Sequence, residues 1–261
     1  MQDIRKEVHL NVPFRMLAGH LIDRFIENGF NPEIGFDAQA LEGCSFEDFR
    51  GVAERLRKHG LTTTFHFPFM DLSPGSPETA IRELTLLRFR QVLPLIPFFR
   101  PEVAVCHTGY DTRRYGFMRE EWLQRSIEVW ADLAKTLAVE GCPLVLENVY
   151  EENPQEMSGL LEPLRPFGVG FCLDTGHQAA FSKATLTEWV RGMAPYIRRL
   201  HLHDNSGLQD DHLALGKGTI DFKKLFRELK RAGVQPGVTL EPHREEDVLP
   251  SLRTLEELWR R

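Results

Sequence analysis

Short apolar segments alternate along the chain with longer segments in which apolar residues recur at helical spacing. Eight runs have the length and composition of strands and are expected at residues 8–12, 31–36, 62–67, 103–107, 143–148, 169–174, 197–203 and 238–241. The segments between them have charged faces and predict helices at residues 17–28, 46–59, 77–98, 120–139, 154–164, 186–194, 221–232 and 246–260. Strands that alternate with helices are typical of parallel βαβ units.

Repetition of one strand–helix unit predicts an α/β fold, a closed (β/α)8 TIM barrel. No linker or low-complexity stretch divides the chain, so one domain is expected over residues 1–261. A doubly wound open sheet is the alternative. Several predicted helices are followed by glycine, as at Gly29 and Gly233, which suits a left-handed C-cap.

A histidine or a carboxylate stands where most of the apolar runs end. These residues are His66, His107, Glu147, Asp174, His201 and Glu241. Such groups cost free energy beside apolar runs unless they are paired or bound to a metal. Because the carboxyl ends of barrel strands form one mouth, where the active sites of this fold lie, we expect these side chains to converge on a metal-dependent active site.

Glu147, Asp174, His201 and Glu241 form the strongest candidate set, and we predict that they bind one divalent metal ion. Carboxylates mixed with imidazole suit zinc, manganese, magnesium or cobalt. The alternative is that each is a buried polar group paired with a basic residue of a neighbouring strand. Arg199 is the one obvious basic candidate in the predicted strands.

Further polar residues lie just beyond the strands. His177 follows Asp174 in the segment Asp-Thr-Gly-His, where Gly176 suits a sharp turn, and Asp210 and His212 lie in a later loop. They are expected to bind an additional metal or to hold substrate hydroxyls, with solvated loop residues as the alternative.

Two alternative roles remain open for several other polar residues. His66 and His107 complete a second metal site or hydrogen-bond the substrate. Lys217 lies in a Gly-Lys-Gly turn that is too short for a phosphate loop by itself, although it follows the seventh strand, where barrels often hold phosphate. His203 shares a face with His201 and is expected either at the surface or behind the ligands.

Bulk properties narrow the function. The formal net charge of −6 argues against a broad nucleic-acid surface. The N-terminus lacks the basic start and apolar core of a signal peptide, and no apolar stretch is long enough to span a bilayer, so a cytoplasmic protein is expected. The four scattered cysteines are expected as reduced thiols. The sequence is compatible with a homo-oligomer.

Three segments resemble the xylose isomerase-like TIM-barrel superfamily. They read Phe-Cys-Leu-Asp-Thr-Gly-His at residues 171–177, His-Leu-His-Asp at 201–204 and Asp-Asp-His-Leu-Ala-Leu-Gly-Lys-Gly at 210–218. The superfamily contains sugar isomerases and epimerases as well as the endonuclease IV type of abasic-site nuclease (AP endonuclease family 2). The resemblance covers the whole barrel.

The two branches imply different metal counts. In the nuclease branch nine residues hold three zinc ions. The resemblance then implies a first ion at His66, His107 and Glu147, a second at Glu147, Asp174, His201 and Glu241, and a third at His177, Asp210 and His212. In the epimerase branch a single ion uses the second of these sets. There Glu147 and Glu241 also act as the acid–base pair, through an enediolate, and His177 and His212 position hydroxyls.

The segment after His66 favours the sugar branch. The nuclease family carries a tyrosine there that helps to open DNA, whereas this chain reads Phe-Pro-Phe-Met, an apolar substrate cover that includes Phe67. The acidic charge agrees, and retention of all nine ligands points the other way. We therefore expect a sugar or sugar-phosphate isomerase or epimerase with zinc or manganese, one to three ions, a small sugar as partner and no nucleic acid. The alternatives are a multinuclear zinc phosphoesterase and a metal-binding barrel without catalysis.

Overall fold

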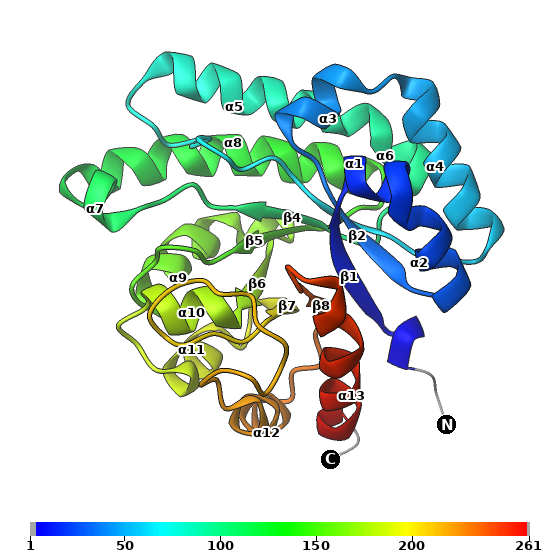
Figure 1. Ribbon diagram of the computed structural model, residues 1–261. Coiled ribbons are helices and arrows are strands. Elements are labelled where there is room, and N and C mark those ends of the chain that lie inside the picture. The colour runs from blue at the N-terminus through cyan, green and yellow to red at the C-terminus, as the bar shows by residue number, and fades with distance from the viewer. Residues whose placement is uncertain (1–3, 260–261) are drawn as a thin grey trace.

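Eight parallel strands close into a barrel in the order of the sequence (Figure 1). The computed structural model describes residues 4–259. The strands are β1 (Val8–Pro13), β2 (Asn31–Gly35), β3 (Thr64–His66), β4 (Ala104–His107), β5 (Leu144–Glu147), β6 (Gly170–Asp174), β7 (Ile197–Leu202) and β8 (Gly237–Leu240). Leu10 of β1 lies opposite Leu240 of β8, which closes the ring. The predicted barrel is confirmed, and the open sheet is wrong.

Helices surround the barrel (Figure 1). Those that fall in predicted helical segments are α2 (Ile22–Asn28), α4 (Phe46–Lys58), α5 (Thr79–Val92), α6 (Ile96–Phe99), α8 (Arg119–Val139), α9 (Pro154–Leu164), α11 (Leu186–Met193), α12 (Phe222–Ala232) and α13 (Val248–Trp259). The short helices α1 (Phe14–Met16), α3 (Ala38–Gly43), α7 (Thr112–Tyr115) and α10 (Thr175–Phe181) lie outside them. A π-helical turn over Leu17–Leu21 precedes α2. The last predicted helical residue, Arg260, lies outside the described residues.

Local signals explain where helices begin and end. A capping box starts α4, because Ser45 and Asp48 each accept a hydrogen bond from the other's backbone N–H. Gly29 after α2 and Gly233 after α12 have φ of 65° and 68°, the left-handed C-cap that the sequence predicts. The four cysteines are free thiols. Within residues 4–259, none of the helices has the length and apolar character needed to cross a bilayer.

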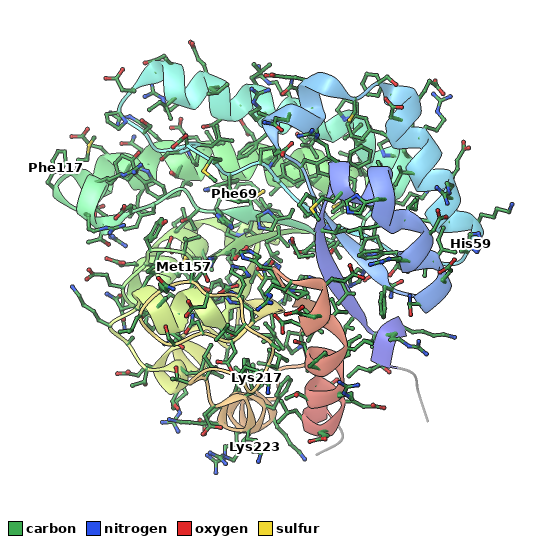
Figure 2. The ribbon with its side chains drawn as sticks, in the orientation of Figure 1. His59, Phe69, Phe117, Met157, Lys217 and Lys223 are labelled. Carbon is green, nitrogen blue, oxygen red and sulfur yellow. The ribbon has the colours of Figure 1, made fainter. Side chains whose placement is uncertain are left out.

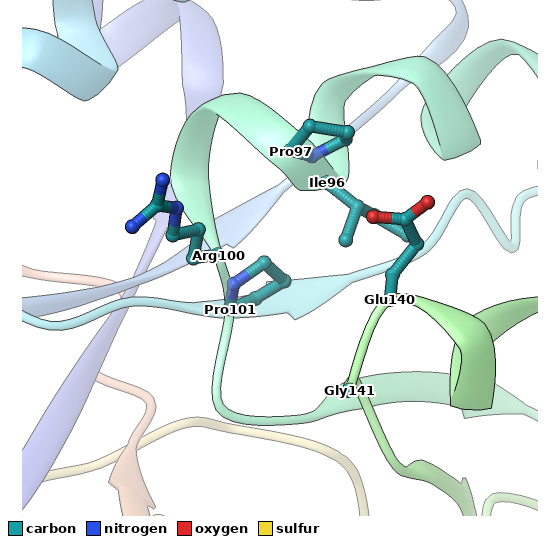
Figure 3. A pocket seen from close by; sticks show the side chains of 6 residues that line it. All are labelled: Ile96, Pro97, Arg100, Pro101, Glu140 and Gly141. Carbon is teal, nitrogen blue, oxygen red and sulfur yellow. The ribbon is translucent and has the colours of Figure 1, made fainter.

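Alternation along the strands divides their side chains between two layers. In β3, Phe65 packs against Phe99 of α6, with ring centroids 5.3 Å apart, whereas Thr64 and His66 point into the barrel. Residues at the ends of the strands therefore face the carboxyl-terminal mouth. A pocket of about 360 Å³ lies instead where α6 and α8 lead into β4 and β5, at the opposite end (Figure 3). It is lined by Ile96, Pro97, Arg100, Pro101, Glu140 and Gly141, none of which is a candidate site residue of the sequence.

Candidate metal centre

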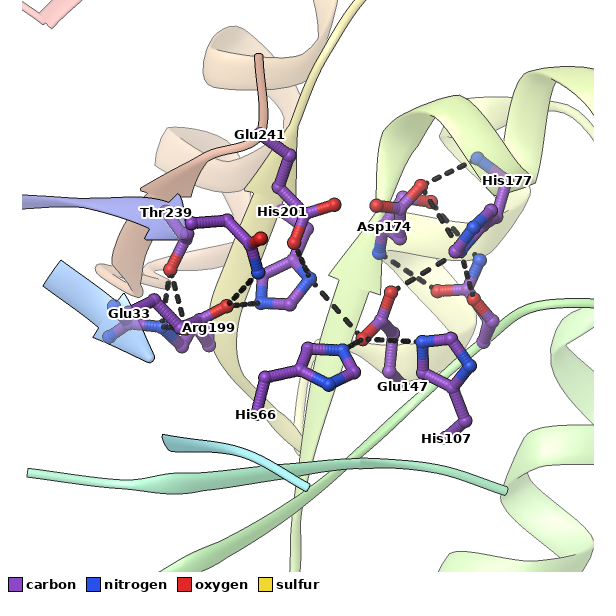
Figure 4. A network of polar contacts seen from close by, with 12 residues as sticks. Glu33, His66, His107, Glu147, Asp174, His177, Arg199, His201, Thr239 and Glu241 are labelled. Atoms are coloured by element: carbon purple, nitrogen blue, oxygen red, sulfur yellow. Dashed lines mark hydrogen bonds and ion pairs between the residues drawn. The ribbon is translucent and has the colours of Figure 1, made fainter. Parts of the chain in front are cut away.

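Nine candidate ligands come together at the carboxyl-terminal mouth of the barrel, and Figure 4 shows seven of them. They are His66 of β3, His107 of β4, Glu147 of β5, Asp174 of β6, His177 of α10, His201 of β7, Asp210 and His212 of the β7–α12 loop, and Glu241 after β8. All but His107 and Asp210 are buried. The expected convergence is therefore present, and each of the nine contacts at least one other.

The Glu147 carboxylate lies at the centre of the group (Figure 4). Its Oε2 atom is 3.2 Å from His66 Nε2, 3.5 Å from His107 Nε2 and 3.2 Å from His201 Nδ1. Its Oε1 atom is 3.3 Å from His177 Nδ1. One carboxylate thus joins ligand groups on several strands, which suits a bridging ligand.

The other three of the four core candidates, Asp174, His201 and Glu241, lie on two sides of the Glu147 carboxylate. On one side, Glu241 Oε1 lies 3.0 Å from His201 Nδ1. On the other, Asp174 and His177 form a group with Glu147 in which one ligand atom from each lies within 4.8 Å of the others. Asp174 Oδ1 also accepts the backbone N–H of His177 and so caps α10. The predicted loop at His177 is therefore a helix, and its N-cap is itself a candidate ligand.

Asp210 joins two imidazoles into a third group. Its Oδ2 atom is 3.4 Å from His177 Nε2 and 3.0 Å from His212 Nε2. The other ring nitrogens face backbone carbonyls, His177 Nδ1 at 3.0 Å from Asn148 O and His212 Nδ1 at 2.9 Å from Glu241 O. A carbonyl only accepts, so each Nδ1 carries a proton. In the metal-free protein burial alone would lower the pKa of both rings, but neighbouring carboxylates raise it, so Nε2 also carries a proton and donates it to Asp210. Loss of that proton frees the Nε2 lone pair for a metal ion.

The donor set fits divalent metal ions. Glu147 Oε1, both ring nitrogens of His201 and Asp210 Oδ1 are buried and lie beside oppositely charged groups without forming a hydrogen bond, which is costly for polar atoms unless something binds them. The contacts of 3.0–3.5 Å between ligand atoms are close to the roughly 3.3 Å that separates ligands around a tetrahedral zinc ion. The nine donors are carboxylates and imidazoles, which also suit manganese or cobalt, whereas Cys172, whose sulfur lies within 4.8 Å of ligand atoms of Glu147 and His201, would as a thiolate favour zinc.

Charge coupling shifts the pKa values of these groups. Burial alone would raise the pKa of Glu147, but the imidazoles of His201 and His107 hold it well below the usual range. Burial lowers the pKa of His107 to about 3. Burial alone would also lower the pKa of His212, yet Asp210 and Glu241 raise it to about 9. In the metal-free protein, protons therefore occupy part of the place that metal ions would take.

Glu33 is a site residue that the sequence does not single out. Its carboxylate is fully buried on β2, with Oε1 3.0 Å from His201 Nε2. Its Oε2 accepts hydrogen bonds from Thr64 and Thr239 and lies 3.3 Å from Arg199 Nε (Figure 4). Arg199 thus neutralises Glu33, and the alternative that it pairs with the four core candidates is wrong. The sequence feature that could have identified Glu33 is its position: it is a carboxylate within an apolar strand and not at the end of one.

His203 also belongs to the centre. It is buried, with Nε2 3.2 Å from Asp174 Oδ2. Its ring stacks on that of His212 at 3.8 Å, which stacks in turn on His243 at 3.6 Å. Of the two positions expected from the sequence, the surface one is wrong, because His203 is buried. One ligand atom from each of His203, His212 and Glu241 lies within 4.8 Å of the others, so His203 also has the position of a ligand.

Phe67 and Lys217, two predicted substrate contacts, lie away from the centre. Phe67 is fully buried on the outer side of the barrel, where its ring packs 5.8 Å from that of Phe89 in α5. Phe69 and Met70, the other two residues expected to cover the substrate, are exposed, and Phe69 stacks on His107 with ring centroids 4.2 Å apart. Lys217 is exposed near α12, apart from Phe69 (Figure 2).

The turn around Lys217 holds a carboxylate of the chain itself. The fully buried Asp204 accepts four backbone N–H groups, from Asn205, Gly216, Gly218 and Ile220, at 2.8–3.0 Å. Backbone amides that converge in this way form an anion site. Because Asp204 fills it, the amides of this turn are not free to bind the phosphate that its position suggests.

Comparison with known proteins agrees with the fold and the motifs. Residues 31–259 match the sequence model of the xylose isomerase-like TIM barrel family. The chain belongs to this family. Among its relatives, uncharacterized protein MJ1311 of Methanocaldococcus jannaschii is 25% identical over 237 residues, which cover 86% of this chain and 81% of the relative. Uncharacterized protein MJ1614 of the same organism is 27% identical over 216 residues, 80% of this chain and 82% of that protein.

Solved structures give the same picture. The TTHB071 protein from Thermus thermophilus, soaked with ZnCl2, superposes with a TM-score of 0.81 at 28% identity, over 97% of both chains. A D-tagatose 3-epimerase-like protein superposes with a TM-score of 0.80 at 22% identity, again over 97% of both chains, and shows the fold.

Proposed function

We propose that this family member is a divalent-metal-dependent isomerase or epimerase of a small sugar. The observation that carries the proposal is the pair of carboxylates at His201: Glu147 and Glu241 lie 3.2 and 3.0 Å from the same imidazole nitrogen. Carboxylates that share a site with a metal ligand suit proton transfer at carbon next to a carbonyl. The family and the epimerase-like fold neighbour support this chemistry.

The proposed metal ligands are Glu147, Asp174, His201 and Glu241, with zinc or manganese as the ion. When bound, the ion would polarise the carbonyl and an adjacent hydroxyl of a ketose and so acidify the neighbouring C–H. The zinc-soaked relative supports a metal in this fold but does not identify it.

Side chains of the protein would carry out proton transfer, bind the substrate hydroxyls and exclude water. Glu147 and Glu241, which lie beside the same ring nitrogen of His201, would take the two proton-transfer roles: Glu147 would accept a proton and Glu241 would return one on the other carbon or the other face. His177 and His212 would orient hydroxyls. Phe69, stacked on His107 at the mouth, would cover the apolar face of the sugar and exclude water.

The filled turn at Asp204 favours a substrate without a phosphate group. Its four amides are committed to a buried carboxylate, and Lys217 is exposed. We therefore propose an uncharged ketose rather than a sugar phosphate.

A three-metal phosphodiester hydrolase is the second candidate, and the third ligand group favours it. The Nε2 atoms of His177 and His212 both face Asp210, an arrangement that a one-metal isomerase does not require. Several metals would together neutralise a phosphate and activate water.

Metal analysis with two activity assays separates the candidates. Purified protein is analysed for metal by mass spectrometry, and a panel of ketoses is incubated with it in D2O. Proton transfer exchanges a substrate C–H for deuterium, which NMR detects without knowledge of the product. Exchange in wild type and its loss in Glu241→Gln would support the isomerase. Three ions per chain and incision of abasic-site DNA at physiological salt, without exchange, would overturn it.

A further inference from the structure

The imidazole of His201 lies between the Glu33 carboxylate on one side and the carboxylates of Glu147 and Glu241 on the other (Figure 4). Its Nδ1 faces Glu147 and Glu241, the proposed metal ligands, whereas its Nε2 is 3.0 Å from Glu33 Oε1. Glu33 and His201 are both fully buried. A carboxylate that holds one nitrogen of a ligating histidine fixes its orientation and makes the other nitrogen a better donor.

In three other candidate histidines, one ring nitrogen has a neutral group as its hydrogen-bond partner. The Nδ1 atoms of His66, His177 and His212 each face a backbone carbonyl, at 2.9–3.1 Å. A neutral carbonyl orients the ring but supplies less charge than a carboxylate. His201 therefore receives stronger support than these three histidines.

Glu33 is itself held from several strands. Its Oε2 accepts hydrogen bonds of 2.8 Å from Thr64 on β3 and Thr239 on β8, and Arg199 on β7 lies 3.3 Å away. Arg199 also donates to Thr239 at 2.9 Å. These contacts occupy one oxygen and compensate the charge, and the other oxygen lies 3.0 Å from His201 Nε2 and accepts a weaker hydrogen bond of 3.4 Å from Asn11. The network lies in the barrel interior, apart from the solvent-exposed mouth.

We infer that Glu33 is a positioning residue that fixes His201 toward Glu147 and Glu241 and makes this the tightest metal site of the centre, the one that fills first. The inference rests on the metal binding proposed above, and goes beyond it in ranking the sites and naming the residue that sets the rank. In this arrangement Glu33 acts through the His201 ring. One of its oxygens lies within 4.8 Å of ligand atoms of His201 and Glu241, but Oε2 accepts from the two threonines, and Oε1 lies beside His201 Nε2 and accepts from Asn11.

Zinc titration of the metal-free protein against a chromophoric chelator tests the inference. Wild type is compared with Glu33→Gln, which keeps the shape but removes the charge. Thr64→Val is the matched control, because it removes one contact of the Oε2 atom and leaves the contact with His201 intact. We expect Glu33→Gln to weaken the tightest site by about 10- to 100-fold. Thr64→Val should change it by less than about threefold, and the weaker sites should be unchanged in both.

Two further measurements distinguish the positioning of His201 by Glu33 from a general contribution of Glu33 to the stability of the fold. Melting of the metal-free proteins reports the stability of the network, and the visible spectrum of the cobalt-loaded protein reports the geometry of the tight site. A changed cobalt spectrum in Glu33→Gln, but not in Thr64→Val, is expected. Glu33→Asp, which keeps a charge for Arg199 but withdraws the carboxylate, replaces Glu33→Gln if that variant does not fold. Unaltered affinity in the Glu33 variant, or equal loss in both variants, overturns the inference alone. Absence of zinc binding in wild type would reject the proposed metal dependence itself.

Discussion

The imidazole of His203 occupies the space beside Gly176 that any side chain at position 176 would need. A Cβ atom there would lie 1.8 Å from His203 Cε1. Gly176 is buried in the first turn of α10, and its φ is not positive, so the sharp turn expected from the sequence is not its role. Its lack of a side chain instead lets His203 reach Asp174.

Replacement of Gly176 by alanine should therefore displace His203. We expect Gly176→Ala to lower the free energy of unfolding of the metal-free protein by about 1–3 kcal/mol, because the packed ring must move. Urea denaturation measures this. Gly19→Ala is the control, since nothing lies within 4 Å of a Cβ there. His203→Ala should relieve most of the added cost in the double variant, and strict additivity would refute the steric explanation.

Glu147 and Glu241 should differ in how much metal they retain. Glu147 contacts His66, His107 and His201, so Glu147→Gln should lose metal from more than one group. Glu241→Gln should empty mainly the site at His201 and slow deuterium exchange by more than about tenfold. Elemental analysis after dialysis gives the ion count. Wild-type metal content and exchange in Glu241→Gln would reject its assignment as a ligand.

Metal binding at His212 should release protons near neutral pH. A metal ligand must be a neutral imidazole, whereas the pKa of His212, which burial alone would lower, is raised to about 9 by Asp210 and Glu241. At pH 7.5 the metal-free ring is therefore protonated, and affinity at the third group should rise with pH until about 9. Competition with protons then begins well above the ordinary histidine pKa of ~6.5. Calorimetric zinc titration in two buffers of different ionisation enthalpy reports the protons released. Equal heats would contradict the prediction.

Asp204 should contribute strongly to stability. In Asp204→Asn the amide NH2 group meets backbone donors, so buried N–H groups lose their acceptor, at a cost of about 2 kcal/mol or more. Asp211→Asn is the matched control, because Asp211 accepts from Ser206 at the surface of the same loop and should matter much less. Chemical denaturation of both metal-free variants provides the comparison, and similar midpoints would argue against the role of Asp204.

The sequence predicts features that depend on residues close together along the chain. It does not predict contacts between segments that are far apart in the sequence. Strand ends were predictable, because apolar runs stop at polar residues such as His107. Glu33 was not, because its contacts with Arg199 and Thr239 join residues 166 and 206 positions apart. Phe67 shows the effect of register: a residue beside His66 in sequence points to the other face of its strand. Helix α10 is short, and its cap, Asp174, reads equally well as a ligand.

The carboxylate at Asp204 has a consequence for the thermodynamics of substrate binding. Loops built on converging amides commonly become ordered when a phosphate arrives, and part of the binding free energy is then spent on that ordering. Here the anion belongs to the chain, so the loop that carries Asp210 and His212 is organised during folding. The entropy loss is met during folding, so a small neutral sugar of the kind proposed here would spend no binding free energy on ordering this loop.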